Sequence, residues 1–388
     1  MLEVFISIFV SSILKFLSHP NFIYLNGFGF FAWIYYVPFL YFIPLFSYKK
    51  SLLCGFFYGF LSYFLSCFWL IKYNIYAGLS VYVLFGIYWA VIFCIIKFFT
   101  RFYRFSFLIN TLILFIFEFF ITQGYLGFSY GVSGYTQWKV PFLLKAARYT
   151  KVWGITFLII LFNCVVSECI SPMLRKKKWN IIQQSGLIFT IMLFIQHILV
   201  GYCGCYAKTD DILKISLIQN NSDPWKEGFD EYQKEVDDLI NLTNKALREN
   251  PETELVVWPE TSVVVDVINN FIYKKDKKRE KLARKLFNYF NSIDCRFLIG
   301  NNYKDFNSAI LFTPSEESER EGKTIIPDYQ IYSKNHLVPF SEDFPFRVLF
   351  SGLYEKMIES GNVFWQSGNK INLLNCDGVM IGTPICFE

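Results

Sequence analysis

The chain has 388 residues, of which 54% are hydrophobic, 20% aromatic and only 18% charged, and its formal net charge is +5. Soluble globular domains carry about a quarter charged residues, so this composition, with a mean hydropathy of +0.33, indicates a membrane protein. The small positive charge forms no polybasic arm and no nucleic-acid-binding motif is present, so nucleic acid is not an expected partner.

Seven apolar stretches precede residue 205, and most are close to the ~20 residues that a helix needs to cross a bilayer. They cover residues 2–18, 24–47, 52–72, 79–99, 105–123, 152–171 and 182–202. The first is short enough to pass for a signal peptide, but it lacks a basic n-region and a small-residue cleavage site. The sequence therefore predicts a multi-span α-helical membrane bundle of about seven spans over residues 1–205.

Positively charged loop residues predict the orientation of these spans. The densest runs follow or end spans two, four and six: Lys49, Lys50, Lys97, Arg101, Arg104, Arg175, Lys176, Lys177 and Lys178. By the positive-inside rule this side is cytoplasmic, so everything after Gly201 lies outside, which for a bacterial inner membrane is the periplasm. Four basic residues after span five weaken the pattern: Lys139, Lys145, Arg148 and Lys151.

The loop over residues 124–151 is rich in glycine and aromatic residues, including Tyr125, Phe128, Tyr130, Tyr135 and Trp138. Two interpretations remain open. The loop forms an interfacial aromatic belt, as many membrane proteins have, or it forms a lipid-facing rim near an active site.

From about residue 206 the composition becomes charged, and short strand and helix patterns alternate. Apolar alternation and short apolar runs predict strands at 211–219, 254–258, 296–300, 308–312 and 378–385, and helical spacing predicts helices at 228–249 and 274–290. This alternation predicts an α/β domain with a largely buried sheet over residues 206–388.

Three polar residues of this domain are candidates for chemistry because each follows a predicted strand or lies in a loop beside one. Glu260 follows an apolar strand and Pro259, Lys334 lies in a loop with Glu342 eight residues later, and Cys386 ends the last predicted strand. Taken singly, each has an ordinary interpretation: an exposed turn carboxylate, a solvated loop lysine and a buried structural cysteine. Taken together, they form an ordered Glu–Lys–Cys set.

The residue types of this set suit acyl transfer through a covalent intermediate. A cysteine attacks as its thiolate, and a nearby carboxylate can take the thiol proton. A lysine ammonium can stabilise the oxyanion of a tetrahedral intermediate, and the backbone amide of Phe387 can add a second donor. The set needs no metal and no cofactor, which agrees with a chain that has only 3 histidines and no zinc-like or disulfide-like spacing among its 10 cysteines.

These residues resemble the Glu–Lys–Cys triad of the nitrilase superfamily, and the whole chain resembles bacterial apolipoprotein N-acyltransferases. The most specific stretches are WPET at 258–261, KNHLVPFSE at 334–342 and ICFE at 385–388, and GYTQ at 134–137 is also similar. The resemblance implies an α-β-β-α sandwich for the second domain. It also implies the roles of six residues: Glu260 as general base, Lys334 as oxyanion stabiliser, Cys386 as nucleophile, Glu342 and Glu388 as supporting acidic residues, and Trp225 beside the acyl pocket.

The resemblance implies transfer of an acyl chain from a phospholipid, through a cysteine thioester, to the N-terminal diacylglyceryl-cysteine of apolipoproteins. Two departures from the family pattern are Ser341 in place of glycine and Phe387 in place of tyrosine. Neither removes a catalytic group.

The family continues past the cysteine with more of the domain and an eighth span, whereas Glu388 ends this sequence. The domain is therefore expected to be incomplete at its C-terminus, through truncation, a split gene or a frameshift. A terminal carboxylate beside Cys386 would disfavour the thiolate, and an uncovered sheet edge would weaken the fold.

Two alternatives to acyl transfer stay open. The chain is a membrane-anchored nitrilase-type amidase, or it is an inactive truncated remnant.

Overall fold

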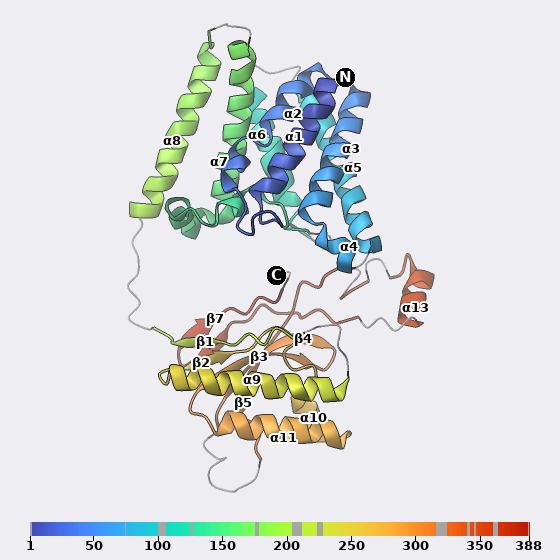
Figure 1. Cartoon of the computed structure of the whole chain (residues 1–388), viewed down its shortest axis with the longest axis vertical. Helices are drawn as coiled ribbons and strands as arrows, with labels where there is room; N and C mark the ends of the chain where they lie inside the picture. Colours follow the sequence, from blue (N-terminus) through green and yellow to red (C-terminus); the bar gives the residue numbers. More distant parts are fainter. Residues whose placement is uncertain are drawn as a thin grey trace. The chain divides into compact units, whose positions relative to one another are not determined.

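A computed structural model describes residues 2–73, 75–99, 106–124, 127–174, 178–203, 212–222, 228–315, 324–339, 342–344, 347–359, 364–386 and 388. The chain divides into two units, Met1–Tyr206 and Ala207–Glu388. The first unit is helical and the second combines strands with helices (Figure 1).

The helical unit begins with α1 (Leu2–Ser18), η1 (Gly29–Trp33), α2 (Val37–Phe42), η2 (Ile43–Leu45), α3 (Tyr48–Ser66) and α4 (Trp69–Tyr73). It continues with α5 (Ile75–Phe99), α6 (Ser106–Phe120), η3 (Ser133–Gln137), α7 (Pro141–Leu174) and α8 (Ile181–Cys203). Within the described ranges, three stretches of helix are long and apolar enough to cross a membrane: Gly78–Phe99, Pro141–Ile170 and Ile181–Cys203. These helices fit a membrane protein, and the count of seven spans stays a prediction.

The apolar stretch over residues 24–47 is helical only from Gly29 to Leu45, which is shorter than expected. This stretch forms the short helices η1, α2 and η2. Pro38 and Pro44 fall at the starts of α2 and η2, where the missing N–H of proline is tolerated but a continuing helix is not. Gly27 also has a φ of +68°, and a Cβ there would lie 2.5 Å from the carbonyl carbon of His19. The backbone therefore turns back onto the end of α1 before the apolar helical segment from Gly29 to Leu45 begins.

A buried carboxylate fixes the Gly- and aromatic-rich loop to the helical unit. Glu118 of α6 accepts a hydrogen bond of 2.6 Å from the Tyr36 hydroxyl and one of 2.9 Å from the backbone N–H of Ser133. The hydroxyl of Ser133 also donates to this carboxylate. Next to it, a Cβ on Gly134 would lie 2.6 Å from the hydroxyl oxygen of Thr156, so only glycine permits this packing. The loop is thus held tightly at η3.

The second unit contains a mixed five-stranded sheet in the order β1-β2-β3-β4-β5. Its strands are β1 (Ile215–Leu217), β2 (Leu255–Val257), β3 (Arg296–Tyr303), β4 (Phe306–Thr313) and β5 (Asp328–Ser333). The strands β1, β2 and β3 are parallel, whereas β3, β4 and β5 pair antiparallel. A separate hairpin joins β6 (Leu374–Cys376) to β7 (Val379–Ile381).

Alternating residues of the strands bury the two faces of this sheet. One face packs against α9 (Phe229–Glu249), α10 (Val267–Tyr273) and α11 (Lys277–Asn291), which Figure 1 shows on the same side, and uses residues such as Phe297, Ile299, Ile310 and Phe312. The other face, with Leu298, Ala309 and Leu311, packs against Leu374, Cys376 and Ile385. A further helix, α13, covers Ser351–Glu359. The second unit is thus a mixed-sheet domain, and the nitrilase-like sandwich stays a prediction.

The expected strand over residues 378–385 is wrong beyond Ile381. Only Val379–Ile381 pairs, with Leu374–Cys376. Pro384 has no N–H group to donate to a neighbouring strand, so the pairing of β7 cannot continue unbroken to Cys386. Cys386 itself has a φ of 52°, a left-handed conformation that is uncommon outside glycine. The candidate nucleophile therefore lies in a turn, not at the end of a strand.

Candidate active site

The backbone around Glu260 is pressed against the neighbouring strand. After β2, the N–H of Trp258 donates to Leu298 of β3, and the N–H of Gly300 donates to the carbonyl of Pro259. A Cβ on Gly300 would lie 2.4 Å from the carbonyl oxygen of Pro259 and 2.6 Å from the Cα of Glu260. This close approach requires glycine and fixes the position of the Glu260 backbone.

Lys334 directly follows β5, and its ammonium group is buried between carboxylates. Its backbone N–H donates to the carbonyl of Asn307 at 2.9 Å, which extends the pairing of β4 and β5 by one residue. Its Nζ lies 2.9 Å and 2.8 Å from the two carboxylate oxygens of Glu342 and 3.9 Å from Oε1 of Glu260. The Lys334 side chain is 0% exposed, whereas that of Glu260 is 38% exposed. A buried ammonium of this kind requires such partners.

Glu342 and Asn307 hold the two carboxylates in place. Oε2 of Glu342 accepts a hydrogen bond of 2.8 Å from the backbone N–H of Val338. Nδ2 of Asn307 donates to Glu260 at 2.9 Å and lies 3.5 Å from Oε1 of Glu342. One amide group thus bridges two carboxylates that would otherwise repel each other, and Lys334 neutralises part of their charge.

The thiol of Cys386 meets this cluster at Glu260. The residue is exposed, and its thiol lies close enough to the Glu260 carboxylate for the two groups to interact electrostatically. Burial raises the pKa of the Cys386 thiol, and the negative charge of Glu260 raises it further, while the Lys334 ammonium acts in the opposite direction. The thiol therefore lies beside a carboxylate whose charge disfavours the thiolate and near an ammonium whose charge favours it.

Glu388 ties the turn that carries the cysteine to the loop that carries the lysine. Its side-chain carboxylate accepts hydrogen bonds from the backbone N–H groups of Asn335 at 2.7 Å and His336 at 3.1 Å. It also accepts from the Tyr332 hydroxyl at 2.8 Å and from the N–H of Ile385 at 2.9 Å. Burial, followed by the interaction with Glu388, raises the pKa of the Tyr332 phenol. This carboxylate is a positioning group and lies outside the Glu260–Lys334 cluster.

The structure thus brings together four of the six residues that the sequence singled out: Glu260, Lys334, Glu342 and Cys386. It places a fifth, Glu388, against the loop that follows Lys334. The sixth, Trp225, and the backbone amide of Phe387 lie outside the described residues. Sequence reasoning missed Asn307 and Tyr332. Asn307 immediately precedes a predicted strand, but nothing in its local pattern indicates that it contacts two carboxylates.

The arrangement places a cysteine thiol, a carboxylate that can accept its proton and a buried ammonium in one cluster. Such a set is suited to nucleophilic acyl transfer through a thioester, with the ammonium as an electrostatic partner for a developing oxyanion. Together with a helical unit that contains candidate membrane spans, these features fit a membrane protein of the acyltransferase class.

Comparisons with known proteins identify the family within this class. Residues 11–165 match the model of the apolipoprotein N-acyltransferase N-terminal domain. Apolipoprotein N-acyltransferase 1 of Treponema denticola is 35% identical over 408 residues, covering 98% of this chain and 73% of the relative. The corresponding protein of Treponema pallidum is 29% identical, over 74% of this chain and 55% of the relative. Apolipoprotein N-acyltransferase of Borreliella burgdorferi is 27% identical, over 68% of this chain and 49% of the relative.

The chain belongs to the apolipoprotein N-acyltransferase family, and it is accordingly assigned to the acyltransferases. It spans about three quarters of the length of one of these relatives and about half of the length of two others.

Proposed function

We propose that this protein transfers an acyl chain from a membrane phospholipid to the N-terminal amine of a diacylglyceryl-modified apolipoprotein. The observation that carries the proposal is the electrostatic interaction of the Cys386 thiol with Glu260, beside the buried Lys334–Glu342 ion pair. The printed names of the relatives support the lipoprotein acceptor. The phospholipid donor follows from the membrane setting and from the resemblance of the site.

In the first half-reaction, Glu260 takes the proton of the Cys386 thiol, and the thiolate attacks the carbonyl carbon of an acyl ester. Lys334, whose charge acts on the Cys386 thiol, stabilises the oxyanion of the tetrahedral intermediate. Collapse of this intermediate breaks the ester C–O bond, and the leaving alkoxide of the lysophospholipid takes the proton from Glu260. The enzyme is left with a thioester at Cys386.

In the second half-reaction, the α-amine of the lipoprotein cysteine attacks the thioester carbonyl. Glu260 takes a proton from the attacking nitrogen, the C–S bond breaks, and the departing thiolate recovers that proton. The products are an amide on the lipoprotein and the free thiol. Dividing one transfer into two steps lets one nucleophile serve both an ester donor and an amine acceptor.

The membrane placement is part of the same proposal. The dense basic runs on one side of the predicted spans indicate an inner-membrane protein whose second unit faces the periplasm. On that side, both lipid substrates reach the site from the bilayer, and the three apolar helices agree with such a setting.

The acyl-enzyme intermediate provides the test. The full chain is incubated in phospholipid nanodiscs without acceptor, and intact-mass and peptide mass spectrometry then measure an acyl adduct on Cys386. We expect one acyl chain on the wild type and none on Cys386→Ala, with Cys203→Ala as a control because Cys203 is also exposed but lies in α8.

Addition of a diacylglyceryl-modified lipopeptide should discharge the adduct and give an acylated amine. A folded wild-type chain that forms no adduct would rule the proposal out. Release of ammonia from amide substrates without acyl transfer to an amine would favour the amidase.

A further inference from the structure

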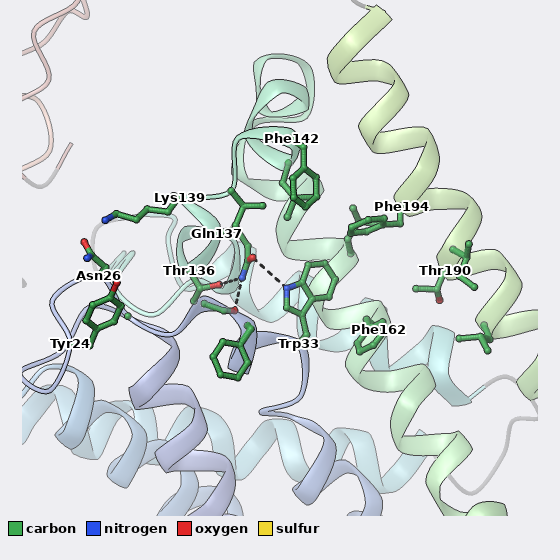
Figure 2. A pocket seen from close by; sticks show the side chains of 18 residues that line it. Tyr24, Asn26, Trp33, Thr136, Gln137, Lys139, Phe142, Phe162, Thr190 and Phe194 are labelled. Carbon is green, nitrogen blue, oxygen red and sulfur yellow. Dashed lines mark hydrogen bonds between the residues drawn. The ribbon is translucent and has the colours of Figure 1, made fainter.

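The helical unit contains a second candidate binding site, which is a cavity of about 650 Å³ between η1, η3, α7 and α8. This volume lies within the range of about 300–1,000 Å³ that is usual for small-molecule sites. Its walls come from segments far apart in the sequence, as Figure 2 shows for Trp33, Gln137, Phe162 and Phe194.

Polar and apolar groups occupy different ends of this cavity. Lys139, Asn26 and Tyr24 lie together at one end, and Phe162 and Phe194 lie at the other (Figure 2). Lys139 is exposed, and its Nζ lies 4.9 Å from the ring centroid of Trp138. The ligand that fits such a cavity is amphiphilic, with an anionic or polar head and a hydrocarbon tail.

The polar groups in the middle of the wall are paired with the protein itself. Nε2 of Gln137 donates to the carbonyl of Gly29 at 2.7 Å and to the Thr136 hydroxyl at 2.8 Å. Its Oε1 accepts from Nε1 of Trp33 at 3.4 Å. Because these groups already have hydrogen-bond partners within the protein, they do not need a polar ligand group. A hydrocarbon chain can therefore lie against them without leaving a buried donor or acceptor unsatisfied.

Aromatic rings line the apolar end. The Trp33 ring lies edge-on to Phe162 with centroids 5.6 Å apart, and to Phe194 with centroids 5.8 Å apart. The hydroxyl of Thr190, on the same wall, donates to the carbonyl of Gly186 at 2.8 Å. These contacts leave this end of the cavity with an apolar lining.

The cavity lies beside a candidate membrane span. The second half of α8 packs on the first turns of α7, since Nε2 of His197 lies 3.0 Å from the carbonyl oxygen of Leu143. The lining residues of α8 run from Leu187 to Phe194, near the middle of the helix, and this segment rises about 10 Å. A bilayer core is about 30 Å thick. On this helix the cavity therefore faces the central third of the apolar length that would cross a bilayer.

We propose that this cavity binds one phospholipid with an anionic headgroup, whose phosphate lies at Lys139 and whose acyl chain lies along Trp33, Phe162 and Phe194. Charge complementarity selects the headgroup. It also gives a role to Lys139, one of the four basic residues after span five that the charge rule for membrane orientation leaves unexplained. The site belongs to the helical unit alone and does not depend on the proposed acyl transfer.

Photoreactive lipids test this site. The full chain is placed in nanodiscs containing phosphatidylglycerol or phosphatidylcholine with the same diazirine-bearing acyl chain, and crosslinked peptides are mapped by mass spectrometry. We expect phosphatidylglycerol to label Ile191 and Phe194 several-fold more than phosphatidylcholine does. Equal labelling by the two lipids, or equal labelling of Met192 and Ile195 outside the cavity, would show bulk lipid contact only and overturn the proposal.

Two pairs of variants locate the headgroup and the chain. Lys139→Gln should lower phosphatidylglycerol labelling several-fold, whereas Lys145→Gln, a basic residue of the same segment outside the cavity lining, should not. Ile191→Trp should reduce labelling by both lipids because it fills the cavity from α8. Its neighbour Met192, 62% exposed and outside the lining, provides the matched Met192→Trp control. Equal effects within either pair would overturn the assignment.

Discussion

Each unit of this protein buries a lysine and a glutamate, but the two clusters differ in what surrounds them. In the helical unit, Lys15 is 2% exposed, and its ammonium lies 5.2 Å from the Tyr63 ring centroid and 5.5 Å from that of Trp89. Glu118, 1% exposed, accepts hydrogen bonds from Tyr36 and Ser133. In the α/β unit, Lys334 is paired directly with Glu342. Aromatic rings and neutral donors stabilise the first cluster, whereas a salt bridge stabilises the second.

The two clusters also differ in their access to solvent. The Lys334 cluster lies beside the partly exposed Glu260 and the exposed Cys386. The Glu118 carboxylate is 1% exposed, and its hydrogen bonds hold a loop against the helices. Access to a nucleophile, more than burial of the charge, therefore distinguishes the proposed active site from the structural network.

The largest effect is expected for Lys334→Met. Loss of the ammonium removes the oxyanion partner and leaves Glu342 buried without its counter-charge. We expect acyl transfer to fall by about 10²–10³-fold. The free energy of unfolding of the α/β unit should fall by about 3–5 kcal/mol. Acyl-adduct formation and denaturant unfolding measure the two effects, with the exposed Lys281→Met on α11 as the control. Wild-type rates in folded Lys334→Met would contradict the oxyanion role.

A smaller and different effect is expected for Glu118→Gln. The glutamine keeps one acceptor oxygen but places an NH₂ group against the donors of Tyr36 and Ser133. The free energy of unfolding of the helical unit should fall by about 1–3 kcal/mol. Acyl transfer per folded molecule should change less than for Lys334→Met, as measured by thermal unfolding and adduct formation on the same sample. A loss of transfer without a loss of stability would show that this cluster also serves the chemistry.

The smallest effect is a shift in the pH dependence of Cys386 alkylation. Because burial and the Glu260 charge raise the pKa of this thiol, its reaction with iodoacetamide should reach half-maximum at higher pH than that of a free cysteine peptide. Glu260→Gln removes a negative charge, so it should lower the midpoint. Lys334→Met removes a positive charge and should raise it. Peptide-resolved mass spectrometry follows the reaction, and identical profiles for both variants and the wild type would refute the described contacts.

Local patterns in the sequence predict part of this fold well. The helices expected at 228–249 and 274–290 are confirmed as α9 and α11, and both have one apolar face. Asp276 directly precedes α11 and caps it, because its carboxylate accepts hydrogen bonds from the N–H groups of Lys278 and Arg279. The strands at 296–300 and 308–312 are confirmed within β3 and β4. The break within 24–47 was not predicted, because composition alone does not weigh two prolines against a long apolar run.

The site shows where sequence reasoning stops. The ordered Glu–Lys–Cys set could be singled out because each member has a local context, such as the apolar strand before Glu260. Asn307 and Tyr332 could not be singled out in this way. The contacts of Asn307 depend on the register of β4 against β5, in which its carbonyl accepts a hydrogen bond from the N–H of Lys334. The contact of Tyr332 depends on the turn that brings Glu388 to its hydroxyl. Such long-range pairings are fixed by packing, and no short motif records them.

The close approach at Gly300 also determines which substitutions this site tolerates. A methyl group there would overlap the Pro259 carbonyl and the Glu260 Cα, so the whole segment 258–261 would have to move away from β3. Displacements of about 1 Å from a reactive geometry can cost ~10²-fold in rate. A residue with no side chain and no part in proton transfer is thus as hard to replace as the residues that react, and inactivating substitutions should cluster along the β2–β3 seam as well as at the charged groups.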